Sequence, residues 1–343
     1  MIKAGIIGAT GYAGLELLRL LLRHPSVEIA ALSSKSYEGK KISDIYPNLY
    51  GIEDRILLSQ SEAVKNCDVV FAALPHGLSE EIALECEQLS VVFIDIGADF
   101  RLSNEVEYEK WYGKKFDHPE IHGSSVYALP ELNRKAIASS RLIANPGCYP
   151  TVSALSLYPA LAQMLVEPSG IVIDAKSGVS GAGRTLSQTT HFPDLNEGFG
   201  PYKIAAHRHT PEIEQTLSAM AGEKIALTFV PHLLPINRGI IATIYTMGRG
   251  ATLKEIHGAY SAFYENEPFV RVLPPGETAN LKNVKLSNYC DISLHEDLHT
   301  GRIIITGAID NMVKGAAGQA IQNMNIVFGL DETAGLMMIP PAF

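Results

Sequence analysis

The first half of the chain alternates short apolar runs with segments of helical periodicity. Apolar runs occur at residues 4–8, 27–34, 67–75 and 91–97, and helical patterns lie between them. Continuous apolar runs of about five residues are typical of parallel strands that are covered on both faces. We therefore expect an α/β domain with a doubly wound parallel sheet here.

Beyond residue 150 the pattern changes to longer strands in which apolar and polar residues alternate. Such strands are expected at 170–178, 224–234, 239–248, 284–294 and 301–309. Alternation of this kind is typical of antiparallel strands with one face on the core. The sequence thus predicts a second domain, of the α+β class with a mixed sheet. A last long helix, at about 315–329, follows the final strand and can pack on either domain.

Length and composition suit two ordinary globular domains. The chain has 343 residues, of which 46% are hydrophobic and 19% charged, and domains usually span roughly 100–200 residues. A formal net charge of -9 gives no attraction for nucleic acid or an anionic membrane. No apolar segment reaches the roughly 18 residues of a membrane span, and the chain opens without a secretory signal. We expect a cytoplasmic protein without nucleic-acid or membrane partners, in which local basic residues hold any anionic substrate.

The four cysteines are widely spaced and include no CxxC pair. They are expected to be separate thiols rather than a disulfide framework. Cys67, Cys86 and Cys290 lie in apolar strand or helix patterns, where a cysteine usually serves as a small buried hydrophobe.

The stretch GATGYAG, residues 8–14, follows the first strand and opens the first helix. A tight turn, close backbone approach to a pyrophosphate and free N–H groups at a helix N-terminus are needed together at such a position. This context favours a Rossmann-type dinucleotide site over a plain turn. The residues expected to contact the cofactor here are Gly8, Thr10, Gly11, Tyr12, Ala13 and Gly14.

The end of the second strand predicts which dinucleotide is bound. It carries Ser33, Ser34 and Lys35, where an NAD site usually has an acidic residue for the ribose 2′-hydroxyl. Hydroxyls and an ammonium suit a 2′-phosphate, so NADP(H) is favoured over NAD, with a solvated polar loop as the alternative. The stretch ALPHG, including Pro75, is placed to line the same groove.

The stretch NPGCYPT, residues 145–151, predicts a strand end, a turn and a helix start. Cys148 would then lie at a helix N-terminus, whose partial positive charge favours a thiolate. The local pattern leaves two interpretations open, a nucleophile and a small buried residue.

Two histidines, His207 and His209, precede a helix expected to have Thr210 as N-cap and Pro211 as its first residue. A histidine beside a helix N-terminus is disfavoured in its charged form, so it can accept a proton near pH 7. The HxH spacing also permits metal ligation, which stays as an alternative.

Six motifs, taken together, resemble the N-acetyl-γ-glutamyl-phosphate reductases, which are similar in fold and chemistry to aspartate-semialdehyde dehydrogenase. They span nearly the whole chain: GATGYAG at 8–14, DIGADFRL at 95–102, NPGCYPT at 145–151, SGVSGAGR at 177–184, HRHTPEIEQ at 207–215 and DNMVKGAAGQAIQNMN at 310–325. The resemblance implies NADPH-dependent reduction of an acyl phosphate to a semialdehyde in arginine biosynthesis. It implies that Cys148 forms a thioester and that His209, rather than His207, is the acid/base.

The resemblance also implies further site residues. For substrate binding these are Arg101, Asn145, Arg184, His207 and Arg208. Guanidinium groups suit a phosphate or the α-carboxylate, with structural salt bridges as the alternative. For cofactor binding they are Ser177, Gly178, Asn311 and Gly315. The last helix would return to the dinucleotide domain, giving domains of 1–147 with 314–343 and of 148–313, in a homodimer or homotetramer.

Two motif matches are discounted on their positions. HEDLH at 295–299 matches a zinc-peptidase string but lies between two expected strands, so a hairpin loop is predicted there instead of a metal-binding helix. YEGKK at 37–41 matches the YxxxK pair of short-chain reductases but directly follows the second strand, too early to face a nicotinamide. No metal site is expected.

Two functions of other classes stay open on sequence grounds. A metallohydrolase would use the histidine clusters, and a non-catalytic dinucleotide sensor would not need Cys148. Within the reductase class, aminoadipyl, aspartyl or carrier-linked acyl phosphates are alternative substrates.

Overall fold

The computed structural model describes residues 1–342, which form two compact units. Unit 1 comprises Met1–Pro146 and Ala316–Met337, and unit 2 comprises Gly147–Gly315 and residues 338–342. The predicted fold class is confirmed, because one sheet is parallel and the other is mixed.

Unit 1 contains a six-stranded sheet in the order β2-β1-β3-β4-β6-β5, with every neighbouring pair parallel. Its strands are β1 (Ile2–Ile7), β2 (Val27–Ser33), β3 (Val69–Ala72), β4 (Val92–Asp95), β5 (Ser125–Tyr127) and β6 (Leu142–Ala144). Strands β3 and β4 are buried along their whole length, as expected of a sheet covered on both faces. The carboxyl ends of all six strands therefore meet at one edge.

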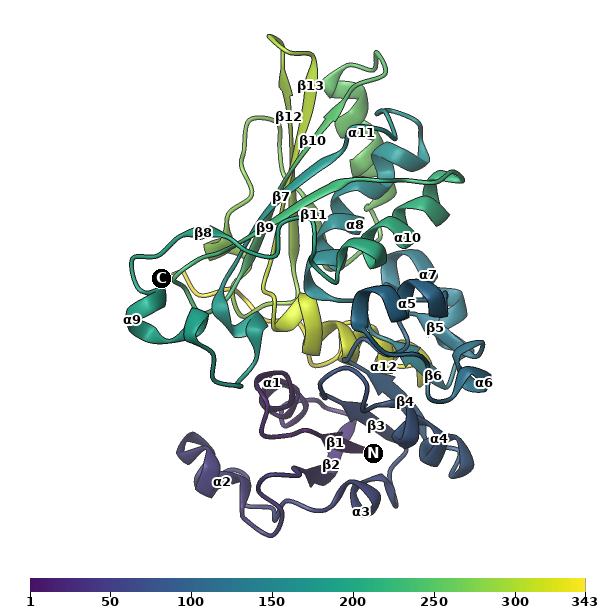
Figure 1. Cartoon of the computed structure of the whole chain (residues 1–343), viewed down its shortest axis with the longest axis vertical. Helices are drawn as coiled ribbons and strands as arrows, with labels where there is room; N and C mark the ends of the chain where they lie inside the picture. Colours follow the sequence, from purple (N-terminus) through teal and green to yellow (C-terminus); the bar gives the residue numbers. More distant parts are fainter. Residues whose placement is uncertain (343) are drawn as a thin grey trace. The chain divides into compact units, whose positions relative to one another are not determined.

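The helices of unit 1 cover this sheet (Figure 1). They are α1 (Tyr12–Leu21), α2 (Ile42–Ile45), η1 (Pro47–Leu49), α3 (Gln60–Val64), α4 (Glu80–Gln88), α5 (Glu105–Tyr112), α6 (Pro119–His122), α7 (Pro130–Ala138) and α12 (Gly318–Val327). Helix α12 contacts α1 and α7, while α3 and α4 contact each other. The buried polar face of α12 is tied in by hydrogen bonds, such as the one from Asn323 Nδ2 to the Ala128 carbonyl (2.9 Å).

Unit 2 is built on a seven-stranded mixed sheet in the order β11-β12-β13-β10-β7-β9-β8. Its strands are β7 (Val172–Ser177), β8 (Gly200–Pro201), β9 (Thr228–Leu233), β10 (Ile240–Met247), β11 (Val270–Val272), β12 (Cys290–Asp297) and β13 (Arg302–Ile309). Burial alternates along β7 and β10, as the alternating sequence predicts.

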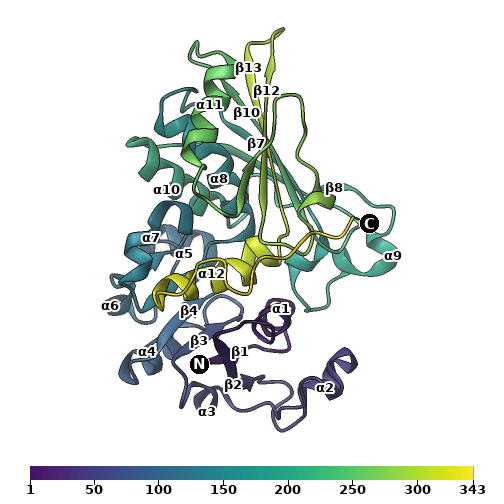
Figure 2. The same cartoon turned by 180° about the vertical axis from the view of Figure 1, so that it is seen from behind.

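The helical elements of unit 2 are α8 (Cys148–Ala162), η2 (Val179–Ala182), η3 (Gln188–Thr190), α9 (Phe192–Leu195), α10 (Thr210–Ala221), α11 (Leu253–Phe263), η4 (Leu281–Asn283) and the π-helical turn η5 (Val313–Ala317). Figure 2 shows α8, α10 and α11 on one side of the sheet. Helix α8 contacts β10, β13, α10 and α11. Tyr260 of α11 and its C-cap residue Tyr264 fix α8 by donating hydrogen bonds to the Ser156 and Leu155 carbonyls (2.6 and 2.5 Å). The start of α8 is thus held on a rigid scaffold.

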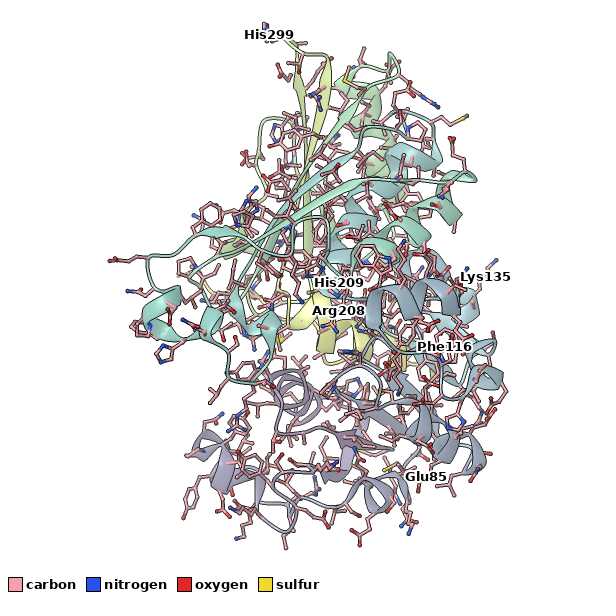
Figure 3. All side chains as sticks on the ribbon, viewed as in Figure 1. Glu85, Phe116, Lys135, Arg208, His209 and His299 are labelled. Atoms are coloured by element: carbon pink, nitrogen blue, oxygen red, sulfur yellow. The ribbon has the colours of Figure 1, made fainter. Side chains whose placement is uncertain are left out.

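The HEDLH stretch lies in the β12–β13 hairpin, whose end carries His299 (Figure 3). The hairpin prediction is confirmed, and no helix presents the two histidines of this stretch. Within residues 1–342, no helix is long and apolar enough to cross a membrane.

Candidate active site

The glycine turn of unit 1 forms the tight connection that its sequence predicts. Gly8 has a φ of 80°, and the Gly8 and Ala9 N–H groups donate to the Ser33 carbonyl (3.1 and 2.9 Å). A Cβ at Gly14 would lie 2.2 Å from the Gly8 carbonyl oxygen, so a side chain there would collide with the turn. These glycines allow the strand, the turn and the helix to approach closely.

The N-terminus of α1 suits a phosphate group. Its N-cap, Gly11, contributes no side-chain cap, and the first turn carries no acidic residue. A helix N-terminus of this kind offers backbone N–H groups and a partial positive charge to an anion.

The end of β2 presents polar groups without an acid. Thr10 Oγ1 and Ser34 Oγ are hydrogen-bonded at 2.7 Å, which joins the glycine turn to this strand end. The Ser33 hydroxyl oxygen is buried and has no hydrogen-bond partner among the described residues. Lys35 is exposed and lines a cavity of about 560 Å³ together with Ser59 and Glu81. The Ser33 and Ser34 hydroxyls and the Lys35 ammonium fit a phosphorylated ribose better than an unmodified one, whereas the Glu81 carboxylate does not favour a phosphate.

In unit 2, Cys148 is the first residue of α8, as predicted. Its N-cap is Gly147, whose N–H donates to Glu212 Oε1 (2.8 Å), while the Gly147 carbonyl accepts from Thr151 N and Oγ1 (both 2.9 Å). Cys148 is half-buried, whereas the other three cysteines are buried. Its thiol therefore lies at a fixed, partly accessible helix N-terminus.

Gly315 packs directly against Cys148. A Cβ at this glycine would lie 2.7 Å from Cys148 Cβ and 3.2 Å from Cys148 Cα. Gly315 was expected to contact the cofactor; within unit 2 it lies beside the candidate nucleophile, and its N–H donates to the Asp310 carbonyl (3.0 Å).

We expect Gly315→Ala to lower kcat/KM by about 10²-fold, because displacing a reacting group by about 1 Å has a cost of this size. Steady-state kinetics would measure this loss. Gly258→Ala is the matched control, since Gly258 is an exposed residue of α11 with open space around its Cβ position. Equal kinetics for Gly315→Ala and wild type would show that Cys148 tolerates the displacement.

His207 is held as a neutral imidazole. Its Nδ1 accepts a hydrogen bond from the His209 N–H (3.1 Å), so the ring proton is left on Nε2, which lies 3.5 Å from Tyr202 Oη. Burial, with Lys203 and Arg208 nearby, lowers the pKa of His207 to about 3. The His207 ring packs edge-on against the rings of Tyr149 and Phe229, with ring centroids 5.4 and 5.3 Å apart. His207 therefore stays uncharged, and its acceptor nitrogen is already engaged.

His209 is the N-cap of α10, one residue earlier than expected, and Thr210 begins the helix. Its ring lies 4.9 Å from that of His207 and 5.9 Å from that of Tyr149, which follows Cys148. Figure 3 labels His209 and the adjacent Arg208 on the segment that leads into α10. The starts of α8 and α10 are thus linked both by Glu212 and by this ring cluster.

Glu212 was not identified from the sequence. It is fully buried on the first turn of α10 and bonds the backbone of the α8 N-cap. The only sequence feature that points to Glu212 is its position three residues after His209, and an acid at that position by itself indicates helix capping. Its use by a second helix 65 positions away depends on the fold.

Two of the expected substrate residues have their side chains engaged within unit 1. Arg101 is 7% exposed and donates from Nε to the Asn145 carbonyl (2.8 Å) and from Nη2 to the Ile96 carbonyl (2.7 Å). Asn145 is fully buried, accepting from Asn323 Nδ2 (3.0 Å) and donating to the Ala316 carbonyl (3.2 Å). In unit 2, Arg184 is exposed and Arg208 half-buried.

Three residues expected at the cofactor are buried in unit 2. Asn311 accepts from the Gly239 N–H (2.7 Å) and donates to Ser180 Oγ (3.0 Å). Ser177 Oγ donates to the Gly178 carbonyl (2.9 Å), and the Gly178 N–H donates to the Gly239 carbonyl (2.9 Å). These bonds fix the segment that contains η2. The described residues contain no cluster of three or more His, Cys, Asp or Glu side chains suited to a metal ion.

Comparison with known proteins gives the family. Residues 3–140 match the family model described as semialdehyde dehydrogenase, NAD binding domain, and residues 148–311 match semialdehyde dehydrogenase, dimerisation domain. The N-acetyl-gamma-glutamyl-phosphate reductase of Clostridium beijerinckii is 60% identical over the full length of both chains. The chain belongs to the N-acetyl-gamma-glutamyl-phosphate reductase family. The resemblance noted in the sequence is confirmed.

Another member of this family and two solved structures are also similar to the chain. The reductase of Brachyspira hyodysenteriae is 56% identical over the full length of both chains. Aspartate semialdehyde dehydrogenase II of Vibrio cholerae, complexed with ASA, has a TM-score of 0.70 at 17% identity, covering 96% of this chain and 98% of that one. The Candida albicans enzyme with NADP has a TM-score of 0.69 at 17% identity, with the same coverage. At these identities the structures support the fold alone.

Proposed function

We propose that this chain reduces N-acetyl-γ-glutamyl phosphate with NADPH to N-acetylglutamate semialdehyde and phosphate, in arginine biosynthesis. The observation that carries the proposal is Cys148 at the start of α8, with its N-cap bonded to the first turn of α10. Sequence identities of 60% and 56%, over the full length, to proteins named N-acetyl-gamma-glutamyl-phosphate reductase support the choice of substrate.

The proposed chemistry begins with Cys148. Its thiolate attacks the γ-carbonyl carbon of the acyl phosphate, and phosphate leaves to give a thioester. When bound, NADPH supplies the hydride that reduces the thioester. The resulting thiohemiacetal then releases the aldehyde and returns the electron pair to the Cys148 sulfur. The N–H groups at the start of α8 are suited to stabilise the oxyanion in these steps.

We assign proton transfer to His209. It would accept the thiol proton of Cys148 and protonate the oxygen that becomes the thiohemiacetal hydroxyl. It would then take that proton back as the aldehyde is released and the electron pair returns to the Cys148 sulfur. His207 is unsuited to this role, because its pKa is about 3 and its Nδ1 accepts from the His209 backbone. We propose that His207 orients His209 through this bond.

Substrate anions are assigned to Arg184 and Arg208, which are not buried. Guanidinium groups can bind a carboxylate or a phosphate with two parallel hydrogen bonds. The hydrogen bonds of Arg101 and Asn145 support a structural role, in which they fix the chain just before Pro146.

The cofactor assignment to NADP(H) rests on the glycine turn, the uncapped α1 N-terminus and the acid-free end of β2. The turn and helix would take the pyrophosphate, and Ser33, Ser34 and Lys35 the 2′-phosphate. The NADP complex of a protein with this fold supports the assignment.

We expect Lys35→Glu to raise KM for NADPH roughly tenfold or more, because a carboxylate would replace an ammonium beside the 2′-phosphate. KM for NADH should stay nearly the same. Initial rates with both cofactors would measure the change. Lys40→Glu, an equal charge change on the same exposed segment, serves as the control. A similar loss in both variants would point to general charge repulsion and away from a specific contact.

The activity is tested by following NADPH oxidation with N-acetylglutamyl phosphate, or NADP reduction with the semialdehyde and phosphate. Aspartyl and aminoadipyl phosphates are the competing substrates in the same assay. Preference for either would correct the substrate, whereas no turnover of any acyl phosphate would overturn the proposed function.

We also propose that the chain assembles as a homodimer or homotetramer through unit 2. The match to a dimerisation domain supports this. The sheet of unit 2 carries α8, α10 and α11 on one side, and the other side carries half-buried strand residues such as Ile241, Tyr245 and Ile304. Light scattering of the purified protein would give the number of subunits. We place the enzyme in the cytoplasm, where NADPH-dependent biosynthesis takes place.

A further inference from the structure

Two buried carboxylates lie at the carboxyl edge of the unit 1 sheet. Asp95 is the last residue of β4, and Asp99 lies on the segment that follows; both are 0% exposed. A buried carboxylate is costly unless donors satisfy it. Their partners therefore indicate what they do.

Asp99 binds the loop that follows β3, residues 73–79, which we call the β3–α4 loop. Its Oδ1 accepts from the Gly77 N–H (2.6 Å) and its Oδ2 from the Ser79 N–H (2.9 Å). Tyr108 of α5, which is also fully buried, donates from its hydroxyl to Asp99 Oδ1 (2.8 Å). One side chain thus fixes two backbone amides of this loop.

The β3–α4 loop adjoins the glycine turn. The Ala73 N–H donates to the Ile7 carbonyl (2.9 Å), and a Cβ at Gly8 would lie 2.4 Å from the Ala73 carbonyl oxygen. Ligands of open parallel sheets bind outside the carboxyl ends of the strands. Any shift of this loop therefore changes the wall of the proposed cofactor site.

Asp95 is coupled to Asp99 through Ser79. Its Oδ1 accepts from Ser79 Oγ (2.8 Å) and the Gly97 N–H (2.9 Å), while its buried Oδ2 has no hydrogen-bond partner among the described residues. Burial, followed by the Asp99 charge, raises the pKa of Asp95 to about 7, and Arg101 opposes this rise. Near Asp99 lie Tyr108, His122 and Lys114. Lys114 Nζ also donates to the Gly77 carbonyl of the loop (2.9 Å), and Glu80 lies near Tyr108 and faces His122.

We propose that Asp99 is a positioning residue that holds the β3–α4 loop in the conformation that binds NADP(H), and that it does so best while Asp95 carries a proton. If Asp95 were ionised, two buried negative charges, Asp95 and Asp99, would both lie beside Ser79, which donates to each of them. Loosening of residues 77–79 would then let water reach the carboxylates. Cofactor affinity falls as the pH rises through about 7. This inference rests on the cofactor assignment under Proposed function.

The first experiment compares Asp99→Asn with wild type. An amide can accept through only one atom, so one of the two loop amides loses its bond. Hydrogen exchange, measured without cofactor, should become faster at Gly77 and Ser79. KM for NADPH should rise about tenfold, the effect of one lost bond to a charged group. Both kcat and KM for the acyl phosphate should stay within about twofold.

Asp68→Asn is the matched control, because Asp68 Oδ2 accepts the Lys3 N–H (2.8 Å) at the opposite edge of the same sheet. Its KM for NADPH should equal that of wild type. If Asp99→Asn does not fold, Tyr108→Phe removes a single donor to Asp99 and should show the same change more weakly.

The second experiment uses Asp95→Asn, which retains an acceptor for Ser79 and cannot ionise. The dissociation constant of NADPH, from its fluorescence, should rise roughly tenfold in wild type between pH 6 and 8.5, the equivalent of one pKa unit. The ratio of wild-type to variant constants cancels titration of the cofactor's own phosphate. An unchanged ratio across this range would overturn the role of Asp95.

The outcomes separate this inference from the proposed function. Faster exchange at Gly77 and Ser79 with an unchanged KM for NADPH would refute the positioning role while leaving the reductase activity in place. If wild-type protein bound no NADPH, the proposed function and this inference would both fail. The exchange data would still show whether Asp99 holds the loop.

Discussion

Cys148→Ala should reduce the rate of NADPH oxidation with N-acetylglutamyl phosphate by about 10⁴-fold or more, because loss of a nucleophile removes the covalent path entirely. The variant should still fold, since Cys148 is half-buried at the start of α8 and the Gly147 to Glu212 bond uses only backbone from this turn. Substrate-dependent NADPH oxidation measures the effect. Mass spectrometry of wild type under turnover should find the acyl group on the peptide that contains Cys148.

The other cysteines provide the control. Burial raises the pKa of Cys67 to about 11 and that of Cys86 to about 12, so both stay protonated and unreactive at pH 8. Iodoacetamide should therefore label Cys148 first and abolish activity in step with that label. Retention of more than a trace of activity by Cys148→Ala would show that the thioester mechanism is wrong.

His209→Gln should lower kcat/KM by about 10²- to 10⁴-fold, the usual contribution of general acid–base catalysis. The loss would appear in kcat as well as in kcat/KM, because proton transfer accompanies the chemical steps. Steady-state rates at several pH values would measure it.

His207→Gln is the matched comparison for this variant. A glutamine can accept the His209 N–H that His207 Nδ1 accepts now (3.1 Å), so we expect a loss below about tenfold. With a pKa of about 3, His207 should contribute no ionisation to the rate profile between pH 5 and 8. A larger loss in His207→Gln than in His209→Gln would reverse the two roles.

The fold could be predicted from the sequence because strands buried on both faces and strands buried on one face have different patterns of apolar residues. The continuous run at 91–97 became β4 of a parallel sheet, and the alternating run at 239–248 became β10 of a mixed sheet. Cys148 at a helix start was predictable as well, because the Pro-Gly turn and the next helix are local in sequence. The N-cap of α10 was misplaced by one residue, which is within the range where helix ends fray.

The engaged side chains could not be predicted. Arg101 and Asn145 are residue types that bind anions and polar ligands, yet Arg101 donates to the Asn145 carbonyl and Asn145 accepts from Asn323. The position of Glu212 in the sequence indicated only helix capping, whereas the structure uses it to bond the α8 N-cap. Nothing in the sequence indicated that Gly315 lies against Cys148. Each of these depends on a partner far away in the chain, and a single sequence does not encode which distant groups meet.

By itself, the sequence determined the fold class, the glycine turn, the acid-free end of β2 and the position of Cys148, since all of these follow from hydrophobic period and local backbone chemistry. Only the tertiary structure decided that Glu212 anchors the α8 N-cap, that His207 Nδ1 accepts the His209 N–H and that Asp99 holds the β3–α4 loop. The physical reason is that burial, protonation and hydrogen bonding depend on neighbours that packing brings together. Glu212 lies 65 positions from Gly147, and Asp99 lies 20 positions from Ser79.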